Sequence, residues 1–185
     1  RHQQGIVFIQ QAKGYAKVVV PLNVTKDETI SVTLTPSAAW DGETRDEKPS
    51  GEGTEVAPYQ IGSGAELAWL ANAVNSASSG TKLYVVLTDD IDLGNQPWTP
   101  IGEDFHEFSG VFDGKGHVVE GLKVSNVADA GLFGVAKGAA IKNLVVRGSV
   151  TGTDNAAGIL AKVKSEACTI ENCGNEATVT VATSR

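Results

Sequence analysis

The fold is decided by residues 119–146, which read VEGLKVSNVADAGLFGVAKGAAIKNLVV. Short apolar runs alternate here with Gly, Asn and Asp, a pattern typical of short strands joined by tight corners. The run 119–124 is similar to the later run 141–146, and a shorter copy occurs at 170–173. The run 130–134 likewise matches the run 157–161. Repeats this closely spaced, built from short strands and glycine corners, are the signature of a solenoid.

The physical reason is burial. A single repeat of two or three strands cannot close a core, whereas stacked repeats cover one another and pair their strands in parallel. We therefore predict an all-β chain whose residues 58–185 form a right-handed parallel β-helix. Asn143 and Asn172 fall at the same repeat position. We expect their side chains to form a hydrogen-bonded ladder, with a ligand role as the alternative.

One helix is expected, at residues 64–75. Residues 63–66 read SGAE, which fits a capping box. Leu67, Leu70, Ala71 and Val74 follow at helical spacing and form one apolar stripe. Because this helix precedes the first repeat, it is predicted to cap the N-terminal end of the solenoid.

Two other segments precede the helix. Residues 1–40 contain three alternating runs, at 6–10, 18–24 and 30–34, which predict a small β-sheet or the end of a β-sandwich-like module. Residues 41–57, DGETRDEKPSGEGTEVA, contain six acidic and two basic side chains and show no apolar period. They are predicted to form an acidic linker or exposed loop.

Composition restricts the partners. The net charge of −7 and the pI near 4.9 disfavour nucleic acid, which needs a basic face. No apolar run approaches the ~18 residues of a membrane span, so no membrane insertion is expected. Arg1 opens no signal-peptide pattern, so we expect a piece of a longer protein with flanking domains. No cofactor or catalytic motif occurs, and we expect neither a cofactor nor enzyme activity.

Few residues suggest binding chemistry. Asp89, Asp90 and Asp92 follow a strand and are weak candidates for Ca²⁺ or for acid–base work, but a structural role in the turn is favoured. Trp98 lies in an expected loop and is the better candidate among the tryptophans for stacking on a sugar. Cys168 and Cys173 are read as small buried side chains, and a disulfide between them would need a turn.

The order of several sequence blocks resembles bacterial surface proteins with GLUG repeats. Gly131, Leu132, Phe133 and Gly134 fit the core of the GLUG motif, and the second copy, which starts at Gly158, lacks the closing glycine. The resemblance covers residues 54–180, in the blocks PYQIGSGAELAWLANAVN, LTDDIDLGNQPWTPIG, FSGVFDGKGHVVEGL, AGLFG and IKNL. It implies a secreted or wall-attached, adhesin-like protein with a right-handed β-helix.

We therefore expect a non-catalytic structural or adhesive module of a large extracellular bacterial protein, binding host glycan or host protein. The alternatives are part of a carbohydrate-active β-helix enzyme and an accessory region of a secreted IgA-peptidase-like protein.

Overall fold

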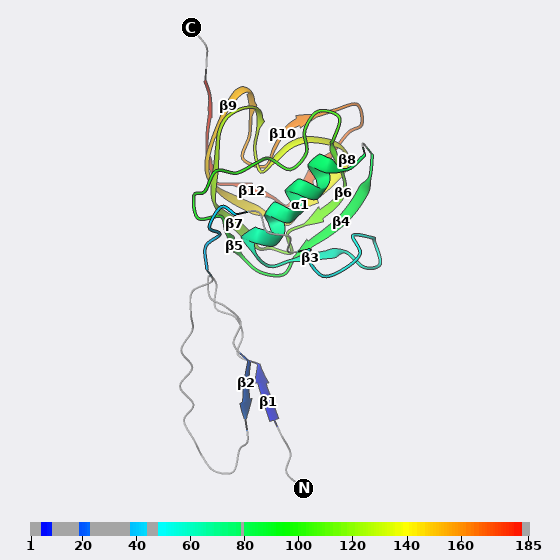
Figure 1. Cartoon of the computed structure of the whole chain (residues 1–185), viewed down its shortest axis with the longest axis vertical. Coiled ribbons are helices and arrows are strands. Elements are labelled where there is room, and N and C mark those ends of the chain that lie inside the picture. Colours follow the sequence, from blue (N-terminus) through cyan, green and yellow to red (C-terminus); the bar gives the residue numbers. More distant parts are fainter. Residues whose placement is uncertain (1–4, 9–18, 23–37, 44–47, 79, 183–185) are drawn as a thin grey trace. The chain divides into compact units, whose positions relative to one another are not determined.

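The computed structural model describes residues 5–8, 19–22, 38–43, 48–78 and 80–182. The chain divides into two compact units, Arg1–Ala38 and Ala39–Arg185 (Figure 1). In the first unit, strand β1 (Gly5–Phe8) pairs antiparallel with strand β2 (Val19–Leu22). The third strand predicted for this segment, at residues 30–34, lies outside the described residues. Assignment of the segment to a β-sandwich stays a prediction.

The second unit is built from two parallel sheets. The first sheet has the order β10-β8-β6-β4-β3, with β11 also paired to β8, and the second has the order β12-β9-β7-β5, with β13 also paired to β9. The strands are β3 (Tyr59–Ile61), β4 (Lys82–Leu87), β5 (Ile91–Asp92), β6 (Phe108–Asp113), β7 (Val118–Ala130), β8 (Phe133–Lys142), β9 (Val145–Ala156), β10 (Leu160–Val163), β11 (Thr169–Glu171), β12 (Gly174–Asn175) and β13 (Thr178–Val181). From β4 onward the chain visits the two sheets in turn, and each such visit to both sheets is called a round. The prediction of a parallel, mostly β fold is confirmed.

Two of the three predicted sequence matches correspond to strand pairing. The match of 130–134 with 157–161 corresponds to the pairing of Phe133 with Leu160, and the copy at 170–173 to the pairing of Ile141 with Ile170. The alignment of 119–124 with 141–146 is wrong as a stacking register, because Val119 pairs with Val146. Both runs have the same apolar alternation, but one lies in β7 and the other crosses from β8 to β9.

The core consists of columns of side chains that run from round to round. In the first sheet, Val85, Phe112 and Ile141 occupy one register position and are each at most 1% exposed. In the second sheet, Val124 and Val150 share a position and are each 1% exposed. In-register residues of parallel strands point to the same face of a sheet. Each column therefore forms a continuous apolar line in the interior of the unit.

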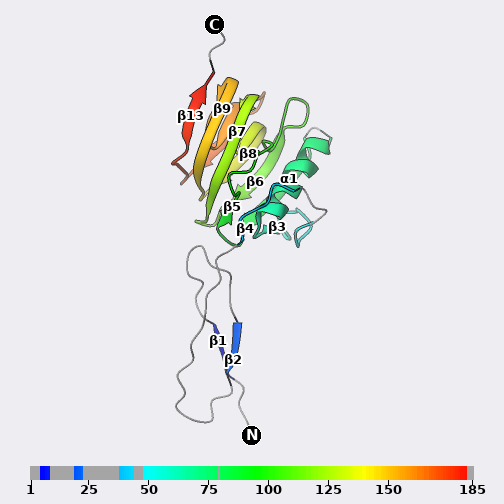
Figure 2. The same ribbon diagram turned by 60° about the vertical axis from the view of Figure 1, so that its left-hand side comes forward.

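Helix α1 (Gly64–Ser76) confirms the predicted helix and its cap. Ser63 Oγ accepts a hydrogen bond from the Glu66 amide at 3.2 Å, and Glu66 Oε2 accepts one from the Gly62 amide at 2.8 Å. The whole predicted stripe is buried, with Leu67 and Leu70 fully inaccessible. Figure 2 shows α1 beside β3 and β4, on the opposite side of the unit from β13. The helix therefore lies at the end of the stack where the rounds begin.

Trp40 belongs to the core of the second unit. Its side chain is 8% exposed, its ring meets that of Trp98 edge to face at 5.7 Å, and its amide donates to the Asp92 carbonyl at 2.9 Å. Ser50 forms an antiparallel bridge with Gln60 next to β3. Parts of the acidic segment 41–57 are therefore fastened to the parallel sheets, while residues 44–47 lie outside the described residues.

Candidate functional site

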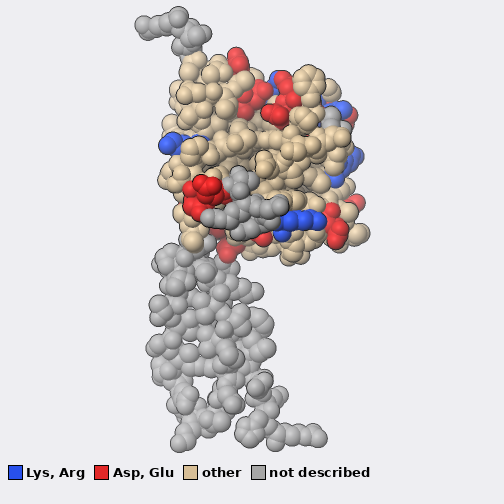
Figure 3. Space-filling view, viewed as in Figure 1, with Lys and Arg blue, Asp and Glu red and all other residues tan. Residues whose placement is uncertain are grey.

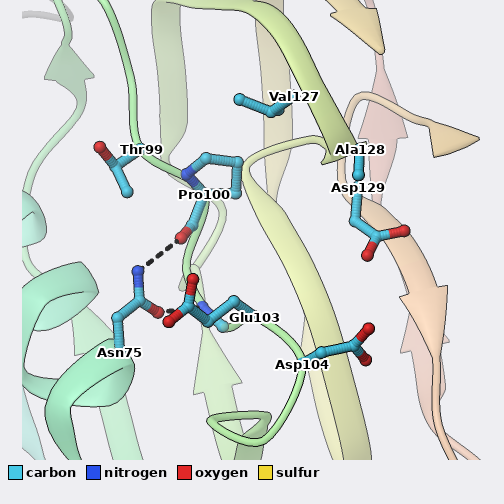
Figure 4. Close-up of a pocket in the computed structure, with 9 residues that line it drawn as sticks. Asn75, Thr99, Pro100, Glu103, Asp104, Val127, Ala128 and Asp129 are labelled. Atoms are coloured by element: carbon cyan, nitrogen blue, oxygen red, sulfur yellow. Dashed lines mark hydrogen bonds between the residues drawn. The ribbon is translucent and has the colours of Figure 1, made fainter. Parts of the chain in front are cut away.

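A hollow of about 310 Å³ lies between the end of α1, the segment before β6 and the end of β7 (Figure 4). Its walls carry three carboxylates and several small or apolar side chains. The lining residues are Asn75, Thr99, Pro100, Gly102, Glu103, Asp104, Val127, Ala128 and Asp129. A pocket with a few convergent polar groups is a candidate binding site.

Asn75 fixes one wall of this pocket. Its Nδ2 donates to the Pro100 carbonyl at 3.1 Å, and its Oδ1 accepts from the Gly102 amide at 2.8 Å (Figure 4). Because both ends of the amide are engaged with the backbone, Asn75 ties the last turn of α1 to the segment 99–102. Its role is to hold this wall of the pocket in a fixed shape.

An exposed aromatic turn lies next to the pocket. Glu103 and His106 exchange two backbone hydrogen bonds, of 3.2 and 3.0 Å, and leave Asp104 and Phe105 at the tip. Phe105 is 75% exposed and has a φ of +76°, a conformation that non-glycine residues rarely adopt. His106 Nδ1 donates to the Ala77 carbonyl at 2.7 Å. The turn is thus anchored to the C-terminal end of α1 while its ring faces solvent.

Two lysines from β10 and the segment after it connect the pocket acids across rounds. Lys162 Nζ lies 3.0 Å from Asp104 and 3.4 Å from Asp129. Hydrogen bonds from Lys162 and Lys164 lower the pKa of Asp104, and the hydrogen bond to Asp104 raises the pKa of Lys162. Asp104 is about half exposed and Lys162 about a third exposed, so their ion pair orients the side chains more than it stabilises the fold.

Lys164 contacts two residues at the turn 103–107, Glu107 and Phe105. Its Nζ contacts Glu107 Oε1 at 2.9 Å, and the Glu107 side chain is only 4% exposed. The same ammonium lies 4.6 Å from the centroid of the Phe105 ring, within cation–π range. Hydrogen bonding to Glu107 raises the pKa of Lys164, which keeps the cation charged beside the ring. One face of Phe105 is thereby held in place, and the ring remains accessible.

The surface around this region has charges of both signs. On the face shown in Figure 3, acidic and basic side chains occur in small separate groups over the second unit, with a wide neutral area between them. Electrostatic attraction of a large polyanion needs a continuous basic patch. The visible face has no such patch among the described residues.

The two asparagines predicted to form a ladder do lie in one. Asn172 Nδ2 donates to Asn143 Oδ1 at 2.8 Å, and Asn143 Nδ2 donates to Asp113 Oδ1 at 2.9 Å. The two asparagines have φ values of 54° and 51° and therefore turn the chain at the end of β8 and β11. Burial raises the pKa of Asp113, but the hydrogen bonds from Asn143 and Lys115 outweigh it, and the net pKa is lowered.

The three aspartates suggested by the sequence as Ca²⁺ ligands each accept a hydrogen bond from a different backbone amide. Asp89 Oδ1 accepts from the Asp90 amide at 2.8 Å, Asp90 Oδ1 from the Val118 amide at 2.9 Å, and Asp92 Oδ1 from the Gly94 amide at 2.8 Å. Asp90 also contacts His117 Nδ1 at 3.2 Å. Within the described part of the chain, no three acidic, His or Cys side chains are grouped to hold a metal ion.

Trp98 lies in the core. Its side chain is 5% exposed, and its Nε1 donates to the Leu132 carbonyl at 3.2 Å. Together with the edge-to-face contact with Trp40, this leaves little ring surface for a sugar. The sequence placed Trp98 in a loop between strands, which is right, but the packing of that loop into the core of the second unit could not be read from local polarity.

The residues of the GLUG-like motif are packing positions. Leu132 and Phe133 are fully buried, and a Cβ on Gly131 would meet the carbonyl oxygens of Phe133 and Ala157. A Cβ on Gly134 would approach the Gly102 carbonyl, and one on Gly158 would overlap the side chain of Asn175. Glycine is needed at Gly131 and Gly134 because backbone carbonyl groups lie too close there for a side chain.

Both cysteines are free. Cys168 Sγ lies 3.4 Å from the Ala139 amide, and Cys173 Sγ lies 3.6 Å from the Ile141 carbonyl. Burial raises the pKa of the Cys173 thiol. Each sulfur is therefore a partly buried group that packs between rounds.

Sequence reasoning missed Phe105, Lys162 and Lys164. The signal available was the run Glu103–Glu107, EDFHE, in which one aromatic residue stands between acids where no apolar period requires it. The lysines carried no signal of their own, because their proximity to Asp104 follows from stacking over 58 to 60 residues of sequence.

Comparison with known proteins gives two partial similarities. The chain is 31% identical over 113 residues to a protein of Evansella cellulosilytica described as a putative Gly-rich membrane protein, covering 57% of this chain and 13% of that protein. It is 31% identical over 147 residues to halomucin of Haloquadratum walsbyi, covering 71% of this chain and 2% of halomucin. No family model matches, and no solved structure matches. The chain thus spans only a small part of each relative.

No helix within the described residues has the length and apolar character needed to cross a membrane. One of the two relatives is named as a putative Gly-rich membrane protein and the other as halomucin. The matched segment is thus a small part of two large proteins that carry these names.

Proposed function

We propose that the two parallel sheets are the walls of a right-handed β-helix, with α1 as its N-terminal cap. The alternation of the chain between sheets supports this, because a coil must visit each wall once per round. Successive rounds also pair at nearly constant separation in the sequence, as Val85 with Phe112 and Phe112 with Ile141 do, so the rounds have nearly the same length. The buried stripe of α1, beside β3 and β4, supplies the cap.

The chain then functions as a non-catalytic structural module of a large extracellular protein of the bacterial cell surface. The observation that carries this function is the set of buried columns, such as Val85, Phe112 and Ile141, which give a rod that grows by adding rounds. A rod of this kind holds other domains away from a surface. The two large relatives, of which the matched segment is a small fraction, agree with such a role.

Immunolabelling of intact cells that carry the gene tests the location. Antibodies raised against the second unit are expected to stain intact cells and culture supernatant as strongly as permeabilised cells. Staining that appears only after permeabilisation would contradict the extracellular role.

A second function, adhesion to glycan, is favoured by the pocket beside the Phe105 turn. Phe105 directly follows the lining residues Glu103 and Asp104 in the chain, so its exposed ring and the pocket carboxylates offer an apolar platform and hydrogen-bonding groups, which a pyranose requires. A glycan array probed with the full chain tests this. Phe105→Ala is expected to abolish any signal, and Val56→Ala, which removes an even more exposed side chain elsewhere, is expected to keep it. An unchanged signal in Phe105→Ala would exclude this pocket as the adhesive site.

A further inference from the structure

The last described round of the stack leaves several of its inward side chains exposed. Ile170 stands in register with the fully buried Ile141 but is 49% exposed. Val179 stands in register with Val150 and is 37% exposed, against 1% for its neighbour. The exposed apolar surface is therefore the continuation of the core columns, and not a patch on the outer side of the sheets. We call the surface formed by Ile170, Asn172, Val179 and Val181 the end face.

The backbone of the end face is also open. Strand β11 pairs with β8, and β13 pairs with β9, and neither pairs with a further strand within the described residues. β13 reads TVTV and contains none of the charges or prolines that usually protect an edge. The other end of the stack differs, because α1 buries its own apolar stripe there (Figure 2).

The side-chain ladder points to the same conclusion. Asp113, Asn143 and Asn172 are linked by hydrogen bonds at 2.9 and 2.8 Å, one residue per round. Asn172 is the last member of this series among the described residues. In the ladder Asn143 Oδ1 accepts from the amide group stacked on it, and the Oδ1 of Asn172 has the same lone pairs to offer to a donor in a following round.

We propose that the end face is a docking surface for one more parallel round of the same chemistry, placed one step further along the stack. The occupant presents a branched apolar side chain over Ile170 and another over Val179, and an amide side chain over Asn172. Each existing round meets its neighbour in this way, so the end face repeats an interface that the molecule already uses between β9 and β13.

A second copy of this chain fits the end face less well. Its opposite end carries α1, whose buried apolar stripe takes the place of a further round, so it has no open apolar columns to set over Ile170 and Val179. Two end faces can meet with their inner sides aligned only if their strands run antiparallel, and this reversal takes Ile170 and Asn172 out of line with their columns. The docking surface does not depend on the extracellular role proposed above.

Tandem duplication tests the proposal, because the segment 157–185 spans one period of the stack. The full chain with a second copy of 157–185 appended is compared with the chain alone by amide hydrogen exchange. Amides of β11 and β13 are expected to gain at least about tenfold protection, since edge amides become paired. In the matched control the appended copy carries Lys at the positions equivalent to Ile170 and Val179, and the gain is expected to disappear.

In a second design the segment 130–156, which forms the preceding round, is appended to the full chain in place of the copy of 157–185. This design covers the case in which the appended copy of 157–185 does not fold. Protection of β11 and β13 in either design, lost in its lysine control, supports the proposal. If neither design protects these strands while the original chain keeps its fold, the proposal is overturned. It is also overturned if light scattering shows the unmodified chain to be a dimer that Ile170→Lys dissociates, because a second copy is then the occupant.

Discussion

Shortening either of two side chains in one core column, Ile141 or Ile170, should lower the free energy of unfolding by very different amounts. Ile141→Ala removes three carbons from a side chain that is fully inaccessible, between Phe112 in the round before and Ile170 in the round after. Ile170→Ala removes the same atoms from a side chain that is 49% exposed. The two substitutions are chemically identical, occur in strands of the same sheet, and differ only in whether a further round covers the site.

The magnitudes follow from transfer and cavity terms. Loss of three buried methylene-sized groups costs roughly 2.4 kcal/mol at about 0.8 kcal/mol each, and the cavity left at Ile141 brings the total to about 3–4 kcal/mol. At Ile170 only about half of the transfer term applies and no closed cavity forms. The expected loss there is about 1 kcal/mol.

Urea denaturation of the full chain, followed by tryptophan fluorescence, measures both losses. Trp40, Trp69 and Trp98 all belong to the second unit, with Trp40 and Trp98 in its core and Trp69 packed against it, so the signal reports its unfolding. The midpoint of Ile141→Ala is expected to fall about three times as far as that of Ile170→Ala. Equal losses in the two variants, at an unchanged slope, would refute the columnar core.

Three further outcomes are expected. Asn143→Ala removes a hydrogen-bond donor that lowers the pKa of Asp113. The stabilisation from a lowered carboxyl pKa is present above the pKa of the unfolded chain and is lost as the pH falls through the pKa of the folded chain. Urea denaturation should therefore show a loss of about 1–2 kcal/mol at neutral pH and progressively less below about pH 4, and a loss that does not change with pH would contradict this. Ser63→Ala deletes the helix cap and should cost about 1 kcal/mol, while Ser63→Asp keeps it, as thermal melts of both variants would show. Gly110→Ala, at φ +107° with its Cβ against the backbone of Leu83, should lower soluble yield or unfold the chain, and wild-type stability would contradict the close approach of β4 and β6 at this position.

The elements with strong local signals were predictable from the sequence. The cap at Ser63 and the stripe from Leu67 to Val74 depend only on neighbours within a turn or two of helix, so the helix was placed to within one residue. The parallel arrangement was predictable from repetition, because a repeat too short to close a core must be covered by its neighbour. The matches read from the glycine-bounded run at 130–134 and from the asparagine positions correspond to strand pairs in the structure.

Long-range packing was not predictable in the same way. The match between 119–124 and 141–146 aligns β7 with the end of β8 and the start of β9, and not with its paired residues in β9. Apolar alternation alone does not indicate which of the two sheets a strand belongs to. The sequence places Trp98 in a loop as a candidate for stacking on a sugar, whereas in the structure its ring is buried and its indole N–H donates to the distant Leu132 carbonyl. The contacts of the Phe105 turn with Lys162 and Lys164 could not be predicted, because they join residues that are brought together only when several rounds stack.

The stacking register is the central claim, and methyl-labelled NMR measures it most directly. With Ile and Val methyl groups and Phe rings labelled in the full chain, the account predicts nuclear Overhauser contacts from Phe112 to Ile141, from Ile141 to Ile170, and from Val150 to Val179. Each pair joins the same register position in successive rounds of one sheet. Contacts that instead link strands adjacent in sequence, with the mirrored order of antiparallel hairpins, would contradict the account.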